Sequence, residues 1–241
     1  MKILTDLHTH TDVSVHAYST LYENMLAAKQ KGLEMVACTD HTPALEDAPH
    51  IWHFTCLKDL PRTIEGVKLV RGAETNILDG EGHVDLPDDV MEKLDLVIAS
   101  IHGPVYMKGC GVDHTKTWLG VIENPYIDIL GHSGSPSYAY DIETIVRAAK
   151  DADKCIEINN HSFEVRQDNI ERCREIALAC KRIGTKITVD SDAHFMSNVG
   201  KVNFAVKMLE DIDFPEELVM NLNAERVTEY IFKRRGIRIE F

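Results

Sequence analysis

Histidines are concentrated near the start of the chain, in the stretch DLHTHTDVSVH. His8, His10 and His16 lie close together, directly after a short apolar run. His8 and His10 form an H-x-H pair, and because side chains of an extended segment alternate between its faces, both rings point to the same side. Two imidazoles so placed can bind one metal ion. The same spacing recurs in Asp192-x-His194, near the other end of the chain.

Other residues of metal-binding type also follow short apolar runs. They are His41, Glu74, His102 and His132. The whole candidate set is His8, His10, His16, His41, His102, His132, His194, Glu74 and Asp192. A zinc site takes about four ligands, so this set is too large for one ion and indicates two or three. The excess of imidazole favours zinc, with manganese or iron as substitutes, over calcium or magnesium, which prefer oxygen.

Short β-forming runs alternate with longer helical patterns, which is typical of βα units around a parallel sheet. Seven strands are expected, at residues 3–7, 35–39, 67–72, 95–101, 127–131, 154–159 and 186–190. The carboxyl ends of parallel strands gather at one face of a barrel. Six of the seven runs end in or just before one of the candidate ligands. The sequence therefore predicts an α/β fold, a closed or nearly closed TIM-like barrel with seven strands, whose one face carries the ligands.

Helical patterns separate and follow these strands. Residues 20–31 and 168–183 are each followed by a glycine, Gly32 and Gly184, as is common just past a helix. A third helix is expected at 141–152, beginning at Asp141, and two more at about 200–211 and 224–235. Since no long linker or repeat interrupts the pattern, one domain over residues 1–241 is expected.

Composition limits the classes of partner and the location that are expected for this protein. The formal net charge is −13, and general nucleic-acid binding needs clustered lysine and arginine, so no nucleic-acid partner is expected. No apolar run reaches the roughly 18 residues of a membrane span, and no secretory pattern precedes the first strand, which predicts a cytoplasmic protein. The cysteines lack any C-x-x-C pair and are interpreted as reduced and mostly buried: Cys38, Cys56, Cys110, Cys155, Cys173 and Cys180.

Taken in order, DLHTHT, TDH at 39–41, GAE at 72–74, SIH at 100–102, GHS at 131–133 and DSDAH at 190–194 resemble the PHP family, named for polymerase and histidinol phosphatase. The order and spacing are most similar to its branch of small bacterial phosphatases with three zinc ions. The resemblance covers nearly the whole chain, including EDAPH at 46–50 and EINNHSF at 157–163. It implies a distorted (β/α)7 barrel, in agreement with the strand count, and suggests a homo-oligomer, for which the family gives a trimer.

The resemblance also implies how the ligands are shared among three Zn²⁺ ions. The first ion would take His8, His10, Glu74 and Asp192. The second would share Glu74 as a bridge and take His102 and His132. The third would take His16, His41 and His194. Glu74, Asp192 and His194 are the residues expected to be catalytic.

Paired metals lower the pKa of bound water and hold attacking and leaving oxygens in line, which suits phosphoester hydrolysis. We expect a metal-bridging hydroxide to attack a small phosphomonoester. The formal charge left on three divalent ions and two carboxylates would attract phosphate into an acidic protein. Arg166, after the sixth strand, is the candidate for an additional phosphate contact, with an exposed solubilising arginine as the alternative.

Several alternatives stay open at this point. A histidinol phosphatase would use the same metals, a phosphodiesterase or exonuclease would normally need a basic or aromatic groove, and a zinc buffer would have fully ligated sites. His50 and His53 form an H-x-x-H that is interpreted as part of a long loop rather than a further metal site. His161 is expected near the site without binding metal.

Overall fold

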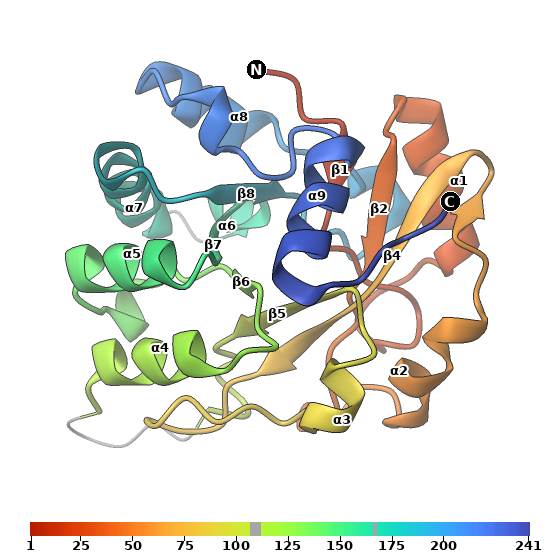
Figure 1. Cartoon of the computed structure of the whole chain (residues 1–241), viewed down its shortest axis with the longest axis horizontal. Helices are drawn as coiled ribbons and strands as arrows, with labels where there is room; N and C mark the ends of the chain where they lie inside the picture. Colours follow the sequence, from red (N-terminus) through yellow and green to blue (C-terminus); the bar gives the residue numbers. More distant parts are fainter. Residues whose placement is uncertain (107–111, 166–167) are drawn as a thin grey trace.

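Parallel strands form the centre of the protein, and helices surround them (Figure 1). The computed structural model describes residues 1–106, 112–165 and 168–241. The strands are β1 (Thr5–Asp6), β2 (Met35–Cys38), β3 (Thr63–Ile64), β4 (Val67–Asn76), β5 (Leu96–Ser100), β6 (Ile129–Leu130), β7 (Cys155–Asn159) and β8 (Ile187–Asp190). The helices are α1 (Leu21–Lys31), α2 (Trp52–Cys56), α3 (Asp88–Met91), α4 (His114–Glu123), α5 (Ile142–Asp151), α6 (His161–Val165), α7 (Asn169–Ile183), α8 (Asn203–Asp211) and α9 (Ala224–Arg235).

The sheet has the order β1-β2-β4-β5-β6-β7-β8, and neighbours along this path are parallel. The short β3 pairs with β4 in the antiparallel sense. Beyond the last strand the sheet nearly closes, because Thr9 forms a parallel bridge with Ala193 and the His10 amide donates to the Ala193 carbonyl at 2.9 Å. The predicted nearly closed barrel of seven parallel strands is confirmed.

Each of the seven expected strands overlaps an observed one, but their limits differ. β1 is shorter than residues 3–7, and β4 continues to Asn76, so Glu74 lies within its strand rather than after it. This extension is possible because β4 changes neighbours, pairing with β2 up to Arg71 and with β5 from Gly72 onward. A Cβ on Gly72 would lie 2.8 Å from both the Leu96 carbonyl and Thr39 Cγ2, so glycine allows this close crossing.

Helix ends follow the expected chemistry. Thr20 and Glu23 form a reciprocal capping box at the start of α1. Gly32 and Gly184 end α1 and α7 with φ of 72° and 84°, the left-handed conformation that glycine adopts without strain. The Asp141 side chain accepts from the Thr144 amide and begins α5. These predicted boundaries are confirmed to within one residue.

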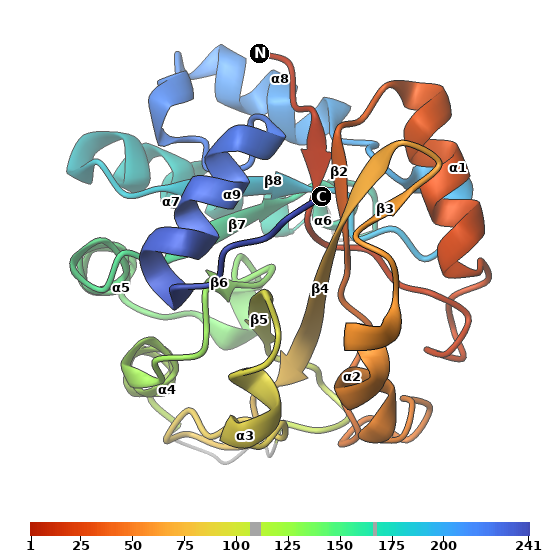
Figure 2. The ribbon, with the colours of Figure 1, turned by 45° about the vertical axis from the view of Figure 1, so that its right-hand side comes forward.

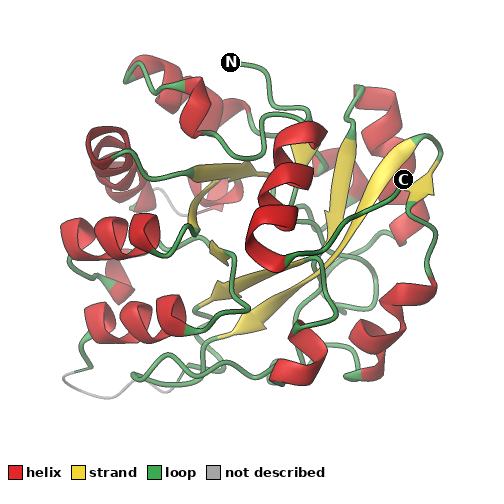
Figure 3. Ribbon diagram, viewed as in Figure 1, coloured by secondary structure: helices red, strands yellow, loops and turns green. Residues whose placement is uncertain are grey.

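The helices on the flanks of the sheet and α9 occupy different positions relative to the strands. Helices α4, α5 and α7 lie side by side along one flank of the sheet, and α1 and α2 lie on the opposite flank (Figures 1 and 3). Helix α9 instead lies across the strands (Figure 2). Its arginines reach the segments that precede β5 and β6, since Arg235 donates to the Leu94 carbonyl at 3.0 Å and Arg234 to the Ile127 carbonyl at 3.1 Å. Helix α9 therefore covers the amino-terminal end of the barrel.

The barrel interior changes from apolar to polar along the strands. Val70 on β4 and Cys155 on β7 pack in one buried cluster with Val227 and Tyr230 of α9. Because side chains alternate along a strand, Glu74 and Glu157 lie on the same faces as Val70 and Cys155 but farther toward the carboxyl end. The apolar layer against α9 is thus followed by a layer of buried acids and histidines. None of the described helices is long and apolar enough to cross a membrane.

Candidate metal centre

Glu74 is the central residue of the polar layer. Its carboxylate is completely buried, and five imidazoles approach it. Oε1 lies 3.3 Å from His8 Nε2, 3.0 Å from His132 Nε2 and 3.4 Å from His102 Nε2. Oε2 lies 2.8 Å from His41 Nδ1 and 3.6 Å from His10 Nε2. Residues from the ends of four strands therefore converge on one glutamate.

Asp192 is the second carboxylate of the centre. Its Oδ1 lies 3.1 Å from His10 Nε2, 3.6 Å from His8 Nε2 and 3.5 Å from His194 Nδ1. Asn159 on β7 donates to its other oxygen at 3.2 Å. Asp192 has a φ of 53°, in the left-handed region that non-glycine residues rarely adopt. Such conformations concentrate at functional sites, where the surrounding contacts maintain them.

The remaining histidines form the outer edge of the centre. His16 Nε2 lies 3.1 Å from His41 Nε2, and the His16 and His194 ring centres are 4.9 Å apart. His16 comes from the loop before α1 and is 44% exposed, while the His194 side chain is 24% exposed. This edge therefore faces solvent, whereas His8 and His10 are completely buried.

The donor atoms fit zinc. Ligand atoms around a tetrahedral ion at 2.0–2.1 Å are about 3.3 Å apart, and the contacts of Glu74 and Asp192 with the His8 and His10 rings fall between 3.1 and 3.6 Å. Despite these short distances, His8 Nε2, His41 Nδ1 and Glu74 Oε2 form no hydrogen bond of acceptable geometry with any described residue. Three sets of converging donors result: His10, His41 and His194; His8, His10 and Glu74; and His41, Glu74 and His102.

The protonation states also suit cation binding. Burial raises the pKa of Glu74, but the neighbouring His8, His102 and His41 together hold it well below its usual range. Burial also raises the pKa of Asp192, but the neighbouring His8, His10 and His194 hold it well below its usual range. Burial and the nearby His41 lower the pKa of His10 to about 3, so its ring is neutral and can donate a lone pair. Both carboxylates are therefore charged at neutral pH.

Several histidines are oriented by an oxygen acceptor on Nδ1. His8 Nδ1 lies 2.7 Å from Glu157 Oε1, His102 Nδ1 2.6 Å from Asn76 Oδ1 and His16 Nδ1 2.6 Å from Asp47 Oδ2. His194 Nδ1 lies 2.9 Å from the Asp192 carbonyl. An acceptor on Nδ1 places the ring proton there and leaves the Nε2 lone pair for a metal.

Glu157 contacts two histidines of the centre, His8 and His132. Besides its contact with His8, its Oε2 accepts from the His132 amide at 2.6 Å. Sequence reasoning missed this role. The signal was present, because the β7 segment CIEIN places Cys155, Glu157 and Asn159 on one face of a strand that is otherwise apolar.

We expect Glu157→Gln to bind zinc 10- to 100-fold more weakly, the usual cost of removing an outer partner of a metal-bound histidine. Competition with a chromogenic chelator measures this directly. The exposed Glu92→Gln is the matched control and should bind zinc as the wild type does. Equal affinity in the two variants would show that Glu157 does not orient His8.

His132 depends on the residue before it. A Cβ on Gly131 would lie 2.7 Å from Ile98 Cγ2 and still closer to Ser100 Oγ, so only glycine fits between these strands. His132 itself has a φ of 25°, and its amide is fixed by Glu157. The GHS stretch thus brings the His132 ring to Glu74 through a backbone conformation that residues other than glycine rarely adopt.

Gly131→Ala should lower both stability and zinc content. Overpacking costs about 1–3 kcal/mol, which corresponds to roughly 2–12 °C in the melting temperature of a chain of this size. Thermal unfolding and metal analysis of the purified variant measure the two effects. Gly103→Ala is the control for stability, because among the described residues its added carbon would contact only Tyr138 Oη, at 3.4 Å. An unchanged melting temperature in Gly131→Ala would contradict the close packing.

All nine residues of the candidate set lie in this centre, and Arg166 lies outside the described residues.

Two further histidines lie near the centre. His53 Nε2, on α2, lies 3.2 Å from Oδ2 of Asp40, the residue before His41, and Asp40 also accepts from the Thr11 amide. The His161 ring stacks on His194 with centres 6.1 Å apart. It therefore lies beside the centre, as expected.

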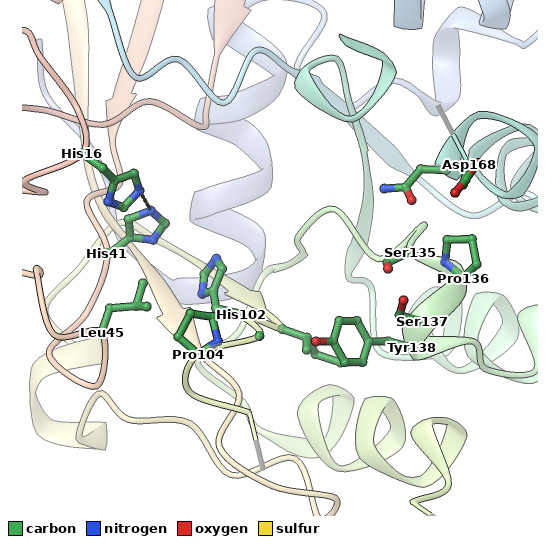
Figure 4. A pocket seen from close by; sticks show the side chains of 13 residues that line it. His16, His41, Leu45, His102, Pro104, Ser135, Pro136, Ser137, Tyr138 and Asp168 are labelled. Atoms are coloured by element: carbon green, nitrogen blue, oxygen red, sulfur yellow. Dashed lines mark hydrogen bonds between the residues drawn. The ribbon is translucent and has the colours of Figure 1, made fainter. Parts of the chain in front are cut away.

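A cavity of about 760 Å³ opens beside the solvent-facing edge of the centre. Figure 4 shows His16, His41 and His102 on one side of it, with Leu45 and Pro104 below them. Ser135, Ser137, Tyr138 and Asp168 lie on the opposite side. The cavity gives a small molecule access to His16, His41 and His102.

The sequence matches known proteins over nearly its whole length. Residues 6–167 match the PHP domain family. A probable phosphatase of Caldanaerobacter subterraneus subsp. tengcongensis is 44% identical over 237 residues, covering 98% of this chain and 93% of that protein. A probable phosphatase of Acetivibrio thermocellus is 44% identical over 239 residues, covering 99% of each.

Solved structures share the fold at low identity. Histidinol phosphate phosphatase from Lactococcus lactis subsp. lactis, complexed with zinc, L-histidinol and phosphate, has a TM-score of 0.66 and 18% identity, covering 89% of this chain and 95% of that one. A chain from an archaeal ribonuclease P structure with mature tRNA has a TM-score of 0.60 and 14% identity, covering 95% of this chain and 90% of that one. At these identities the comparison concerns the fold alone.

Proposed function

The chain belongs to the PHP domain family, and from this membership we propose that it is a phosphatase that hydrolyses small phosphomonoesters at a centre of three zinc ions. The observation that carries the proposal is the convergence of five imidazoles on the buried Glu74. A buried charged carboxylate must be paired with positive charge, and metal ions bound by the surrounding histidines would supply it. The names of the 44% identical relatives support phosphatase chemistry.

The residues would form three sets, of which the first two share Glu74. His8, His10, Glu74 and Asp192 would hold one ion, Glu74 with His102 and His132 a second, and His16, His41 and His194 a third. The sharing of Glu74 is supported by its Oε1, which lies 3.3 Å from His8 Nε2 of the first set and 3.4 and 3.0 Å from His102 Nε2 and His132 Nε2 of the second. Zinc ions bound there would lower the pKa of water to near neutrality and offset the negative charge of a phosphoryl group.

Other contacts of the protein orient the histidine rings and control access to the centre. The Asp192 carbonyl would hold a proton on His194 Nδ1 and so leave the Nε2 lone pair of His194 for an ion, with the His16 and His41 ring centres 4.9 and 5.8 Å away. Glu157 and Asn76 do the same for His8 and His102. Burial of His8 and His10 keeps bulk water from the inner ligands, while the exposed His16 edge leaves a path for the phosphate. The substrate would therefore enter from the cavity.

Hydrolysis of p-nitrophenyl phosphate by metal-free and zinc-reloaded protein tests the proposal. We expect the metal-free protein to have no activity above background and zinc to restore it. Manganese or iron should also restore activity, because imidazole and carboxylate ligands accept these ions. Full activity after complete metal removal would refute a metal-dependent phosphatase.

A further inference from the structure

We propose that the wall formed by Ser135, Ser137, Tyr138 and Asn169 binds the organic part of the substrate, and that this part is an uncharged, polyhydroxylated group of the sugar or sugar-alcohol type. The inference rests on the proposed phosphatase function, since it takes the phosphoryl group to lie at the histidines. The four residues come from η2 (Pro136–Tyr138), the residue before it, and the start of α7. None of them belongs to the metal centre.

The wall faces the histidines across the cavity. His16, His41 and His102 lie across the cavity from Ser135, Ser137 and Tyr138 (Figure 4). A phosphomonoester held at the histidines must direct its ester oxygen and organic group into the remaining space. The volume of about 760 Å³ is that of a site for a whole small molecule, much more than a phosphoryl group requires.

Neighbouring aromatic rings hold Tyr138 in place. Its ring meets Tyr106 edge to face at 5.7 Å and His114 at 5.5 Å. Tyr106 is buried, and its hydroxyl lies 3.1 Å from Thr117 Oγ1 on α4. The phenol is thus held between α4 and the loop after His102, so its hydroxyl can contact a ligand without a large loss of side-chain entropy.

The wall offers both donors and acceptors of hydrogen bonds. Serine and tyrosine hydroxyls both donate and accept. Asn169 is only 3% exposed, and within the described residues its amide nitrogen has no hydrogen-bond partner. A buried donor without a partner is unfavourable, and an oxygen atom of a ligand in the cavity would supply the missing acceptor.

A carboxylate next to the wall disfavours anionic groups. Asp168 lines the same side of the cavity and is exposed, so it repels a second phosphate or a carboxylate. A cationic organic group would satisfy Asp168 but would place further donors against the Asn169 amide. Hydroxyl groups match both residues, because one hydroxyl can accept from Asn169 and donate to Asp168. Neutral polyols therefore fit the wall best.

Matched primary phosphates test this selection. For the zinc-loaded wild type we expect kcat/KM on sorbitol 6-phosphate to exceed that on hexyl phosphate at least tenfold, and to exceed that on L-histidinol phosphate as well. Asn169→Ala and Ser137→Ala should each reduce the ratio of sorbitol 6-phosphate to hexyl phosphate about 3- to 10-fold, the usual value of one hydrogen bond. Ser137 is exposed, so its variant should fold even where Asn169→Ala does not.

Asn203→Ala is the matched control, because Asn203 also begins a helix but is exposed and does not line the cavity. Its ratio should equal that of the wild type. Equal kcat/KM on sorbitol 6-phosphate and hexyl phosphate, with p-nitrophenyl phosphate hydrolysed, would overturn the polyol site alone. Preference for L-histidinol phosphate would overturn it in favour of a cationic group. Absence of hydrolysis on every monoester would overturn this inference together with the proposed function.

Discussion

Glu74→Gln should lose phosphatase activity and bound zinc together. The substitution keeps the size of the side chain but removes the charge that five imidazoles approach. Loss of an outer partner of a metal ligand costs about 10- to 100-fold, so loss of the shared ligand should reduce kcat/KM by more than about 100-fold. Zinc per chain, measured by elemental analysis after gel filtration, should fall by at least one ion.

The exposed Glu123→Gln is the control for this variant. It should retain wild-type activity and zinc content. Far-ultraviolet circular dichroism separates loss of metal from loss of fold, because the barrel core on the α9 side does not involve Glu74. Wild-type zinc content in Glu74→Gln would refute the bridging role of this residue.

Metal removal should destabilise the whole protein. A ligand present at 1,000 times its dissociation constant stabilises the folded state by about 4 kcal/mol, and each kcal/mol is worth roughly 2–4 °C in the melting temperature at this chain length. Chelation should therefore lower the melting temperature by about 8–16 °C for each tight site. Differential scanning calorimetry of metal-free and zinc-loaded protein measures the change.

The Glu74→Gln variant provides the comparison for the calorimetry. Since it is expected to hold less zinc, chelation should lower its melting temperature less than that of the wild type. The direction follows from the buried charges: without cations, Glu74 and Asp192 are compensated only by buried histidines, of which His10, with a pKa lowered to about 3, stays neutral. Equal melting temperatures of metal-free and zinc-loaded wild type would contradict a structural contribution of the metals.

The barrel could be predicted because its strands are short apolar runs separated by well-capped helices. Gly32, Gly184 and Asp141 mark helix boundaries through local backbone chemistry, which needs no tertiary information. Helix α4 was missed because its first turn, HTKT, is polar and rich in β-branched threonine. The extension of β4 through Glu74 was missed because it depends on pairing with β5, a long-range contact.

The candidate ligands could be predicted for a similar reason. Parallel strands bring their carboxyl ends to one face, so residue type and position along each strand suffice to place His41, His102 and His132 near Glu74. The residues that orient the rings are different. Asn76 and Asp47 are ordinary polar residues in sequence, and their roles depend on which histidine the folded chain brings to them.

The ratio of hydrolysis rates on p-nitrophenyl phosphate and bis-p-nitrophenyl phosphate, with zinc-loaded protein, tests the proposed phosphomonoesterase most directly. A strong preference for the monoester is expected, because three cations around Glu74 and Asp192 would favour the additional negative charge of a phosphomonoester. Preference for the diester would contradict the proposal and would direct the search toward nucleic-acid ends.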